Sequence, residues 1–272
     1  MSYLFTKINI KQFPKTQPNN NHHSYQLNQD VLLYNQEGIV QLLDFNQGQF
    51  YALDRIATVM VSSLLDQGIE ATITNLSQIY ETTEEEIRSD LTELSEVLVN
   101  KKLLITRDSL TTKPQYLQQF INNFFLYILK LIIALFRPLI NPQSDPNSLT
   151  INLLLTLSWL SFRCLGWSRT ITLWQEWHQH HINHTVDKQI IETLDQKIKK
   201  AAASNPLLPI MCKERALVGY HLLRTFYHVP ATLKIGINND PFEVHAWVEY
   251  EGMILTDDPT HCQQFTPVTN YK

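Results

Sequence analysis

The stretch from Met211 to Asp258 most constrains the fold of this 272-residue chain. Pro209 stands shortly before Cys212, and proline is tolerated at or before the first turn of a helix but not in its interior. Apolar residues then recur at helical spacing, which predicts a helix with Cys212 in its first turn (Ala216, Leu217, Tyr220, Leu222 and Leu223). A helix N-terminus carries partial positive charge and unpaired N–H groups, so this position favours a thiolate over a thiol.

A strand and then a hairpin are predicted after this helix. Ala231 to Ile237 is rich in β-formers and ends at a cluster of turn formers. Phe242 to Tyr250 alternates with period two, which places His245 on the face opposite the apolar one. Glu251-Gly252 turns the chain, and Met253 to Thr256 forms the return strand.

The length of this turn decides which carboxylate faces His245. A tight two-residue turn sets His245 opposite Asp258, whereas a three-residue loop with a glycine bulge sets it opposite Asp257. Directly opposed residues share a face, so either register brings a carboxylate beside the imidazole. Such a set of thiol, imidazole and carboxylate is typical of a hydrolase or acyl-transferase. The alternative is that Cys212 and His245 are buried structural residues.

Several short motifs occur in order around these positions (Cys212-x-x-Arg215-x-Leu217, Leu222-Leu223-Arg224, Leu233-x-Ile235-Gly236-Ile237, Pro241-Phe242, His245-Ala246-Trp247-Val248-Glu249 and Gly252-x-Ile254-Leu255-x-Asp257). The combination resembles the transglutaminase-like cysteine peptidase of lasso-peptide biosynthesis, the B protein. The resemblance implies a papain/transglutaminase-like cysteine peptidase domain over 149–272. It also implies Cys212 as nucleophile, His245 as base and Asp257, rather than Asp258, as the residue that orients the imidazole.

Charge and cysteine usage exclude some classes of protein. A net charge of −4 and a pI near 6.2 offer no basic surface for nucleic acid. The three cysteines, Cys164, Cys212 and Cys262, lack metal-ligand spacing and form an odd set, which predicts a reducing compartment. Residues 1–29 have no apolar signal core and are expected to form a flexible arm, so we expect a cytoplasmic protein. No cofactor or metal is expected.

The segment 30–107 predicts a small domain of three strands followed by three helices. The strands are Val31 to Tyr34, Ile39 to Leu43 and Gln49 to Leu53. The first helix follows Asp54 and ends before Gly68, the second opens at Thr74 or Asn75, and the third begins at a capping box of Thr83 and Glu86. This order predicts a winged helix, and therefore an α+β protein.

The order of elements, with Gln49-Phe50-Tyr51-x-Leu53-Asp54 and an Asp90…Leu94…Leu103-Leu104 tail, resembles the PqqD-like element that recognises leader peptides. That family implies that a leader adds as an extra strand to the meander edge, against the last helix. The last helix opposes DNA binding, because its only cation, Arg88, stands among six carboxylates (Glu84, Glu85, Glu86, Asp90, Glu93 and Glu96).

Residues 108–148 are expected to hold a linker and an apolar helix. Phe120 to Ile140 is long enough to span a membrane, but Lys130 and Arg137 interrupt it. We therefore expect a buried or interfacial helix, with association at a membrane surface left open. Histidines further along have helical metal-ligand spacing but no acidic partner, so a solvated helix face is expected there (His178, His180, His181 and His184).

The two resemblances together imply a leader peptidase that binds a ribosomally made lasso precursor and cleaves the leader from the core. The precursor is one expected partner, and a lactam-forming, ATP-dependent cyclase of the same pathway is the other. Two alternatives remain. One is an acyl-transferase or transglutaminase acting on a peptide, and the other is a non-catalytic module that delivers the precursor.

Overall fold

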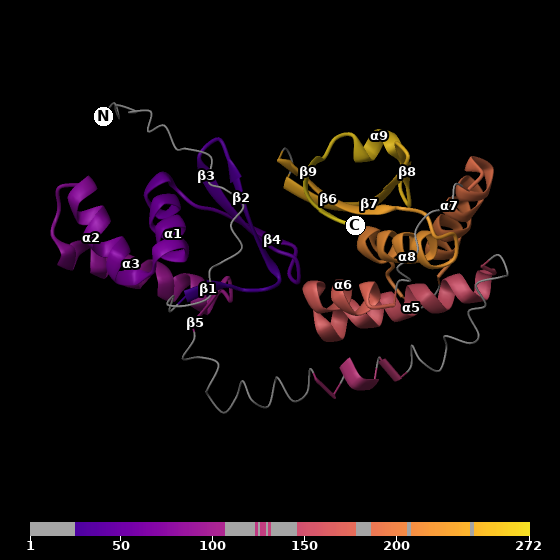
Figure 1. Ribbon diagram of the computed structural model, residues 1–272, viewed down its shortest axis with the longest axis horizontal. Helices are drawn as coiled ribbons and strands as arrows, with labels where there is room; N and C mark the ends of the chain where they lie inside the picture. Colours follow the sequence, from indigo (N-terminus) through magenta and orange to yellow (C-terminus); the bar gives the residue numbers. More distant parts are fainter. Residues whose placement is uncertain are drawn as a thin grey trace. The chain divides into compact units, whose positions relative to one another are not determined.

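The computed structural model describes residues 25–106, 146–177, 186–205, 208–239 and 242–272, with short pieces between 123 and 131. The chain divides into two compact units, Met1–Leu117 and Gln118–Lys272. Each unit combines helices with antiparallel sheet (Figure 1), which confirms the predicted α+β class. The finer boundaries at 29, 107 and 148 stay predictions.

The first unit contains the predicted three-stranded meander. Strands β2 (Val31–Gln36), β3 (Ile39–Asp44) and β4 (Gln49–Ala52) pair in that order, so β2 and β4 are its edges. Glu37 and Gly38 join the first two strands with φ of 51° and 83°. Positive φ at both central residues is the geometry that matches the twist of a two-residue hairpin.

Three helices follow the meander: α1 (Arg55–Gln67), α2 (Ile69–Ile79) and α3 (Glu84–Asn100). The Asp54 side chain caps α1 by accepting from Ala57 N at 2.7 Å, and Thr83 caps α3 as predicted. The predicted start of the second helix at Thr74 or Asn75 is wrong. Gly68, with φ of 81°, ends α1 and leads directly into α2, so no loop separates the two helices.

A short strand lies inside the predicted N-terminal arm. β1 (Tyr25–Leu27) pairs antiparallel with β5 (Leu104–Thr106), and Asn28 N donates to Leu103 O at 3.0 Å. Tyr25 and Leu27 also pack against the buried core of this unit. The end of the expected arm is therefore part of the folded domain, while residues 1–24 lie outside the described residues.

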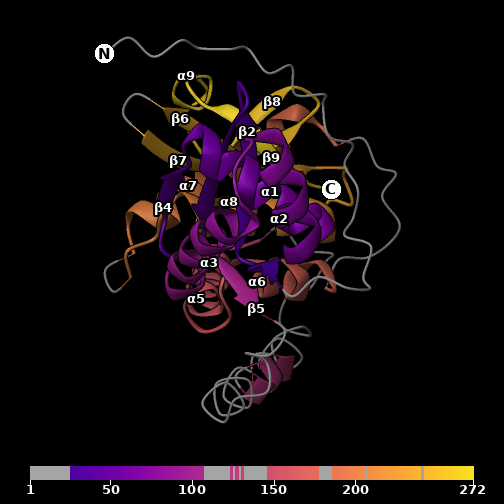
Figure 2. The same ribbon diagram turned by 90° about the vertical axis from the view of Figure 1, so that its left-hand side faces the viewer.

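The second unit is a four-stranded antiparallel sheet covered by helices. Strands β6 (Thr232–Asn239), β7 (Phe242–Tyr250), β8 (Met253–Leu255) and β9 (Thr266–Tyr271) are arranged in the order β8-β7-β6-β9. Helix α8 (Cys212–Thr225) lies against β7 and β6, and α5 (Ser148–Leu165) lies beyond it (Figures 1 and 2). Helices α6 (Trp167–Gln175) and α7 (Lys188–Ala203) also contact α8.

The segment after Pro259, in which no pattern was predicted, is ordered into two elements. A short helix, α9 (Pro259–Cys262), is followed by β9, which pairs with the far edge of β6. The indole of Trp167 donates to the hydroxyl of Tyr271 at 2.9 Å, which ties β9 to α6. Cys262 and Phe265 pack on Trp247, so both faces of β7 are buried rather than one.

Helix α5 accounts for the apolar run Leu149 to Leu165. In the part of the chain that the structure describes, it is the one helix long and apolar enough for a membrane span, but 44% of it is buried inside the unit. A core helix passes the same test, so this is weak evidence for a membrane. Most of the apolar segment 120–140 and the tract from His178 to His184 lie outside the described residues.

Candidate active site

The predicted nucleophile is the first residue of helix α8. Cys212 is half-buried, and its neighbour Met211 precedes the helix in extended conformation. Met211 N donates to Glu214 Oε2 at 2.9 Å, so Glu214 satisfies a backbone donor that the helix itself cannot pair. Burial raises the pKa of Glu214, whose residue is only 2% exposed. This contact fixes the first turn, and with it the position of Cys212.

His245 lies in the middle of β7, on a strand paired on both sides. Its ring stacks on Phe265 with centroids 4.9 Å apart, and His261 meets it edge-on at 4.7 Å. Trp247, two residues along the same strand, stacks at 6.2 Å, as expected for a shared face. These rings leave the His245 side chain only 8% exposed and restrict its orientation.

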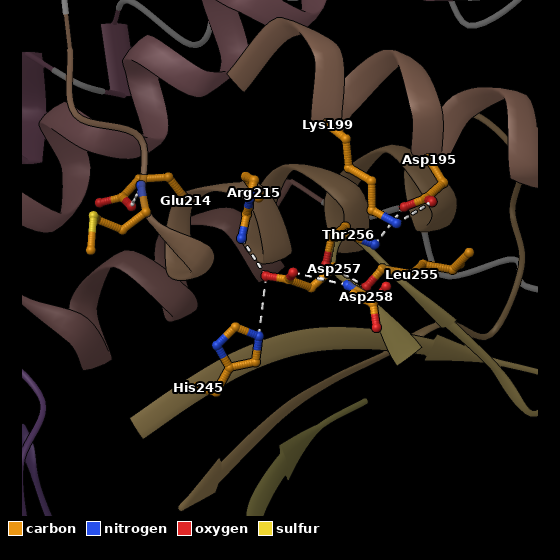
Figure 3. Close-up of polar contacts among 10 residues, drawn as sticks. Asp195, Lys199, Glu214, Arg215, His245, Leu255, Thr256, Asp257 and Asp258 are labelled. Atoms are coloured by element: carbon orange, nitrogen blue, oxygen red, sulfur yellow. Dashed lines mark hydrogen bonds and ion pairs between the residues drawn. The ribbon is translucent and has the colours of Figure 1, made fainter. Parts of the chain in front are cut away.

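Asp257 is the carboxylate that meets this imidazole. His245 Nε2 lies 3.1 Å from Asp257 Oδ2, and Asp257 Oδ1 accepts from Asp258 N at 2.9 Å (Figure 3). The distance between Nε2 and Oδ2 suits an ion pair. Asp258, the alternative, caps α9 by accepting from His261 N at 3.1 Å.

The bulged turn that would set His245 opposite Asp257 does not occur. Tyr250 pairs with Met253 across a two-residue turn, and Val248 pairs with Leu255. Both turn residues have positive φ, 46° at Glu251 and 79° at Gly252, which is the tight geometry. Continued three residues further, this register would set His245 opposite Asp258.

Thr256 is the residue that changes this outcome. Strand β8 ends at Leu255, and Thr256 has φ of 70°, a left-handed conformation that is costly for a β-branched residue. Its N–H donates to Asp195 Oδ1 of α7 at 2.5 Å, and Asp195 Oδ2 accepts from Lys199 at 2.7 Å (Figure 3). The methyl group of Thr256 packs so closely on Gly219 of α8 that a Cβ there would lie 2.4 Å away. Contacts from two helices therefore hold a kink that turns Asp257 toward His245.

Cys212 and His245 are joined by a hydrogen bond between their side chains. Burial opposes the thiolate, but this bond, the charge of His245 and the N–H of Ala246 outweigh it and lower the pKa of Cys212. The structure thus brings together all three predicted site residues, Cys212, His245 and Asp257. Their arrangement favours a thiolate beside an imidazolium, which is the reactive form of a cysteine nucleophile.

The charges of the other two groups agree with this state. Burial opposes a charged imidazole, but Asp257, Cys212 and Cys262 outweigh it and raise the pKa of His245 to about 11. Burial likewise opposes a charged Asp257, but His245, the N–H of Asp258 and Arg215 lower its pKa to about 2. At neutral pH the imidazole is therefore protonated on both nitrogens and positively charged, and the carboxylate is ionised.

Sequence reasoning missed several residues around the imidazole. Cys262, considered without a role, is buried and hydrogen-bonded to His245. His261, Asp257 and His245 form one group whose ligand atoms lie within 4.8 Å of one another. A metal there would displace the proton of His245, which is strongly held at neutral pH. His261 and Cys262 reach His245 only because a turn and a kink precede them. The sequence alone therefore did not reveal that they contact it.

A thiolate at a helix N-terminus, followed by an imidazole and a carboxylate in contact with each other, is characteristic of thiol hydrolases and acyl-transferases. Comparison with protein families agrees: residues 185–270 match the family described as "Transglutaminase-like superfamily". Residues 31–104 match the family described as "Coenzyme PQQ synthesis protein D (PqqD)". No match was found among curated proteins or solved structures.

The chain therefore fuses a PqqD domain to a transglutaminase-like domain, as the resemblance predicted. The second family includes cysteine peptidases and transglutaminases, so it supports a cysteine-type enzyme. The pair supports a peptide-processing role in the biosynthesis of ribosomally made, modified peptides. The domain that carries the proposed site residues matches over 86 residues, from 185 to 270.

The lowered pKa of Cys212 can be measured directly. In the folded protein we expect iodoacetamide to alkylate Cys212 faster than an ordinary cysteine at neutral pH, because the lowered pKa raises the ionised fraction of the thiol. His245→Ala removes the bond and the charge that lower the pKa and leaves burial, which raises it. The rate at neutral pH should then fall, because a smaller fraction of the thiol is ionised. Peptide mapping by mass spectrometry separates Cys212 from Cys164 and Cys262, and equal rates in both proteins would contradict the ion pair.

The contact between Thr256 and Gly219 can be tested by adding one methyl group. Gly219→Ala should lower the free energy of unfolding by about 1–2 kcal/mol, since overpacking outweighs the gain in helix propensity. The double variant Gly219→Ala/Thr256→Ser removes the clashing methyl and should recover most of the loss in denaturant titrations. A single variant as stable as the wild type would show that the methyl does not hold the kink.

Proposed function

We propose that this chain is a leader peptidase of lasso-peptide biosynthesis, which binds the precursor through its first domain and cleaves it with its second. The observation that carries the proposal is the contact of Cys212, His245 and Asp257 in a domain fused to a PqqD domain. A free metabolite needs no precursor-binding domain, so the fusion favours a peptide substrate.

In the proposed mechanism, the thiolate of Cys212 attacks the scissile carbonyl and forms a tetrahedral oxyanion. The N–H of Cys212, at the start of α8, is the best oxyanion donor that we can assign. Collapse breaks the C–N bond while His245 gives its proton to the leaving amine, which leaves a thioester and a neutral imidazole.

Neutral His245 then acts as a base. It removes a proton from a water molecule that attacks the thioester, and the second collapse releases the carboxylic acid and restores the thiolate beside the imidazolium. Asp257 stabilises the imidazolium whenever His245 is protonated, and its contact with Nε2 orients the ring. Thiol chemistry of this kind needs no metal, so metal independence is part of the proposal.

Two alternatives use the same structure differently. In a transglutaminase an amine, rather than water, resolves the thioester, and the three side chains do not distinguish these nucleophiles. A delivery module would need no ionised cysteine, so the lowered pKa of Cys212 favours catalysis. A cyclase that closes the lactam is the proposed partner in the cytoplasm, and contact with a membrane surface remains an alternative.

The first domain offers edges for the leader. In a β-augmentation the leader would pair with β2 or β4, the outer strands of the meander. Helix α3 carries exposed carboxylates, and its single cation, Arg88, is already paired with Glu70 at 2.7 Å. This surface repels phosphate, which argues against nucleic acid as the ligand.

Substitutions in the site should abolish cleavage without affecting leader binding. Cys212→Ala and His245→Ala should each remove leader cleavage, because a nucleophile and its base fail as a unit. Asp257→Asn should lower kcat by about 10³–10⁴-fold, since an amide holds the wrong imidazole tautomer. Asp258→Asn is the matched control and should stay near the wild-type rate. Mass spectrometry of the precursor, with leader affinity measured in parallel, checks each variant. Cleavage by Cys212→Ala would exclude the thiol mechanism.

The fragment 1–106 should bind the leader by itself, with modest dependence on salt. Backbone pairing at a strand edge releases few counterions, unlike DNA binding by a basic helix. A proline within the docked segment of the leader should weaken binding, because it removes an N–H donor. The remaining chain should cleave poorly at low precursor concentration, since docking supplies an effective concentration of order millimolar. Titration by calorimetry, with duplex DNA as control, is decisive: salt-sensitive DNA binding without leader binding would contradict it.

A further inference from the structure

The carboxylate of Asp257 has a second cationic partner besides His245. Arg215 Nη2 contacts Asp257 Oδ2, the same oxygen that lies 3.1 Å from His245 Nε2 (Figure 3). The other oxygen accepts from Asp258 N. The side chains of Arg215 and Asp257 are 25% and 16% exposed, so this ion pair is more shielded from water than a surface pair.

Arg215 comes from the helix that carries the nucleophile. It follows Cys212 by three residues, and residues three apart lie on one side of a helix, one turn from each other. Glu214 anchors the same turn through Met211 N. A single rigid element thus presents both the thiol and the guanidinium toward the hairpin that carries His245.

Asp257 itself is not held by the sheet. It follows the last residue of β8 and the kink at Thr256, so no ladder hydrogen bond orients its side chain. A carboxylate in such a position has free rotation about its side-chain bonds unless other groups fix it. An arginine is charged throughout the working pH range and offers planar donors that fix both the charge and the rotamer of a carboxylate.

We propose that Arg215 is a positioning residue. Its ion pair with Asp257 connects that carboxylate to helix α8 and so fixes the carboxylate and the imidazole relative to Cys212. Arg215 acts through Asp257 and does not touch the reacting atoms. This inference deepens the proposed leader peptidase and rests on it for its kinetic part. The alternative is that the ion pair only stabilises the fold.

The experiment compares Arg215→Gln and Arg215→Lys in the full chain with Lys213→Gln as control. Lys213 lies on the same helix, beside Cys212, but packs over the Phe162 ring and does not contact Asp257. The first measurement is the pH dependence of Cys212 alkylation, which needs no substrate. Its midpoint should rise in Arg215→Gln and rise by less in Arg215→Lys, because the lysine keeps the charge. It should stay unchanged in Lys213→Gln.

The second measurement is leader cleavage as a function of pH. Arg215→Gln should lower kcat by about 10–100-fold with little change in KM, because leader binding belongs to the first domain. Without Arg215 the pKa of Asp257 rises toward its ordinary value, so the acidic limb of the profile should move to higher pH. Arg215→Lys should recover part of both effects.

The outcomes separate the two proposals. If the wild type cleaves no leader but the alkylation midpoint shifts as expected, the leader peptidase fails and the positioning role holds. A folded Arg215→Gln protein with wild-type alkylation and pH profile would overturn the positioning role. If Arg215→Gln does not fold, Arg215→Lys decides, because wild-type kcat and midpoint in that variant would also overturn it. Equal shifts of the alkylation midpoint in Lys213→Gln would overturn it too, because they would show that loss of any nearby positive charge has the same effect.

Discussion

The second unit depends on the contacts of one buried imidazole with a thiol on one side and a carboxylate on the other. His245 is surrounded by Phe265, His261 and Trp247, so its charge is costly unless opposite charges compensate for lost water. Asp257 and the thiolate of Cys212 provide those charges. The partners come from a helix and from a kinked return strand, so packing of α8 on the hairpin and the protonation state of the site depend on each other.

The fold also explains how distant parts of the chain contribute to one site. Helix α7 supplies Asp195, which holds Thr256, and α8 supplies Gly219, which makes room for its methyl group. The segment after Asp258 returns over β7 and buries the face that carries His245. Positions that touch no reacting atom therefore determine where the carboxylate lies.

Local patterns predicted much of this. The side chains of Asp54 and Thr83 cap the helices that they precede, and Pro209 precedes α8. Glu251-Gly252 forms the turn between β7 and β8. The kink at Thr256 was not visible, because a left-handed β-branched residue is held by tertiary contacts alone. Strands β1 and β9 were missed for a similar reason: their pairing partners lie far away in the sequence, in β5 and β6.

The tight turn between β7 and β8 has a consequence for how the sequence of this domain can vary in length. Its tip is solvent-exposed, and such loops usually accept insertions. Here one added residue would slide β8 along β7 by about 3.4 Å and reverse which side chains face inward. The length of the turn and the kink at Thr256 together thus determine which carboxylate lies next to His245. Substitutions compatible with positive φ leave that count unchanged, whereas a single insertion or deletion would require a compensating change before Asp257.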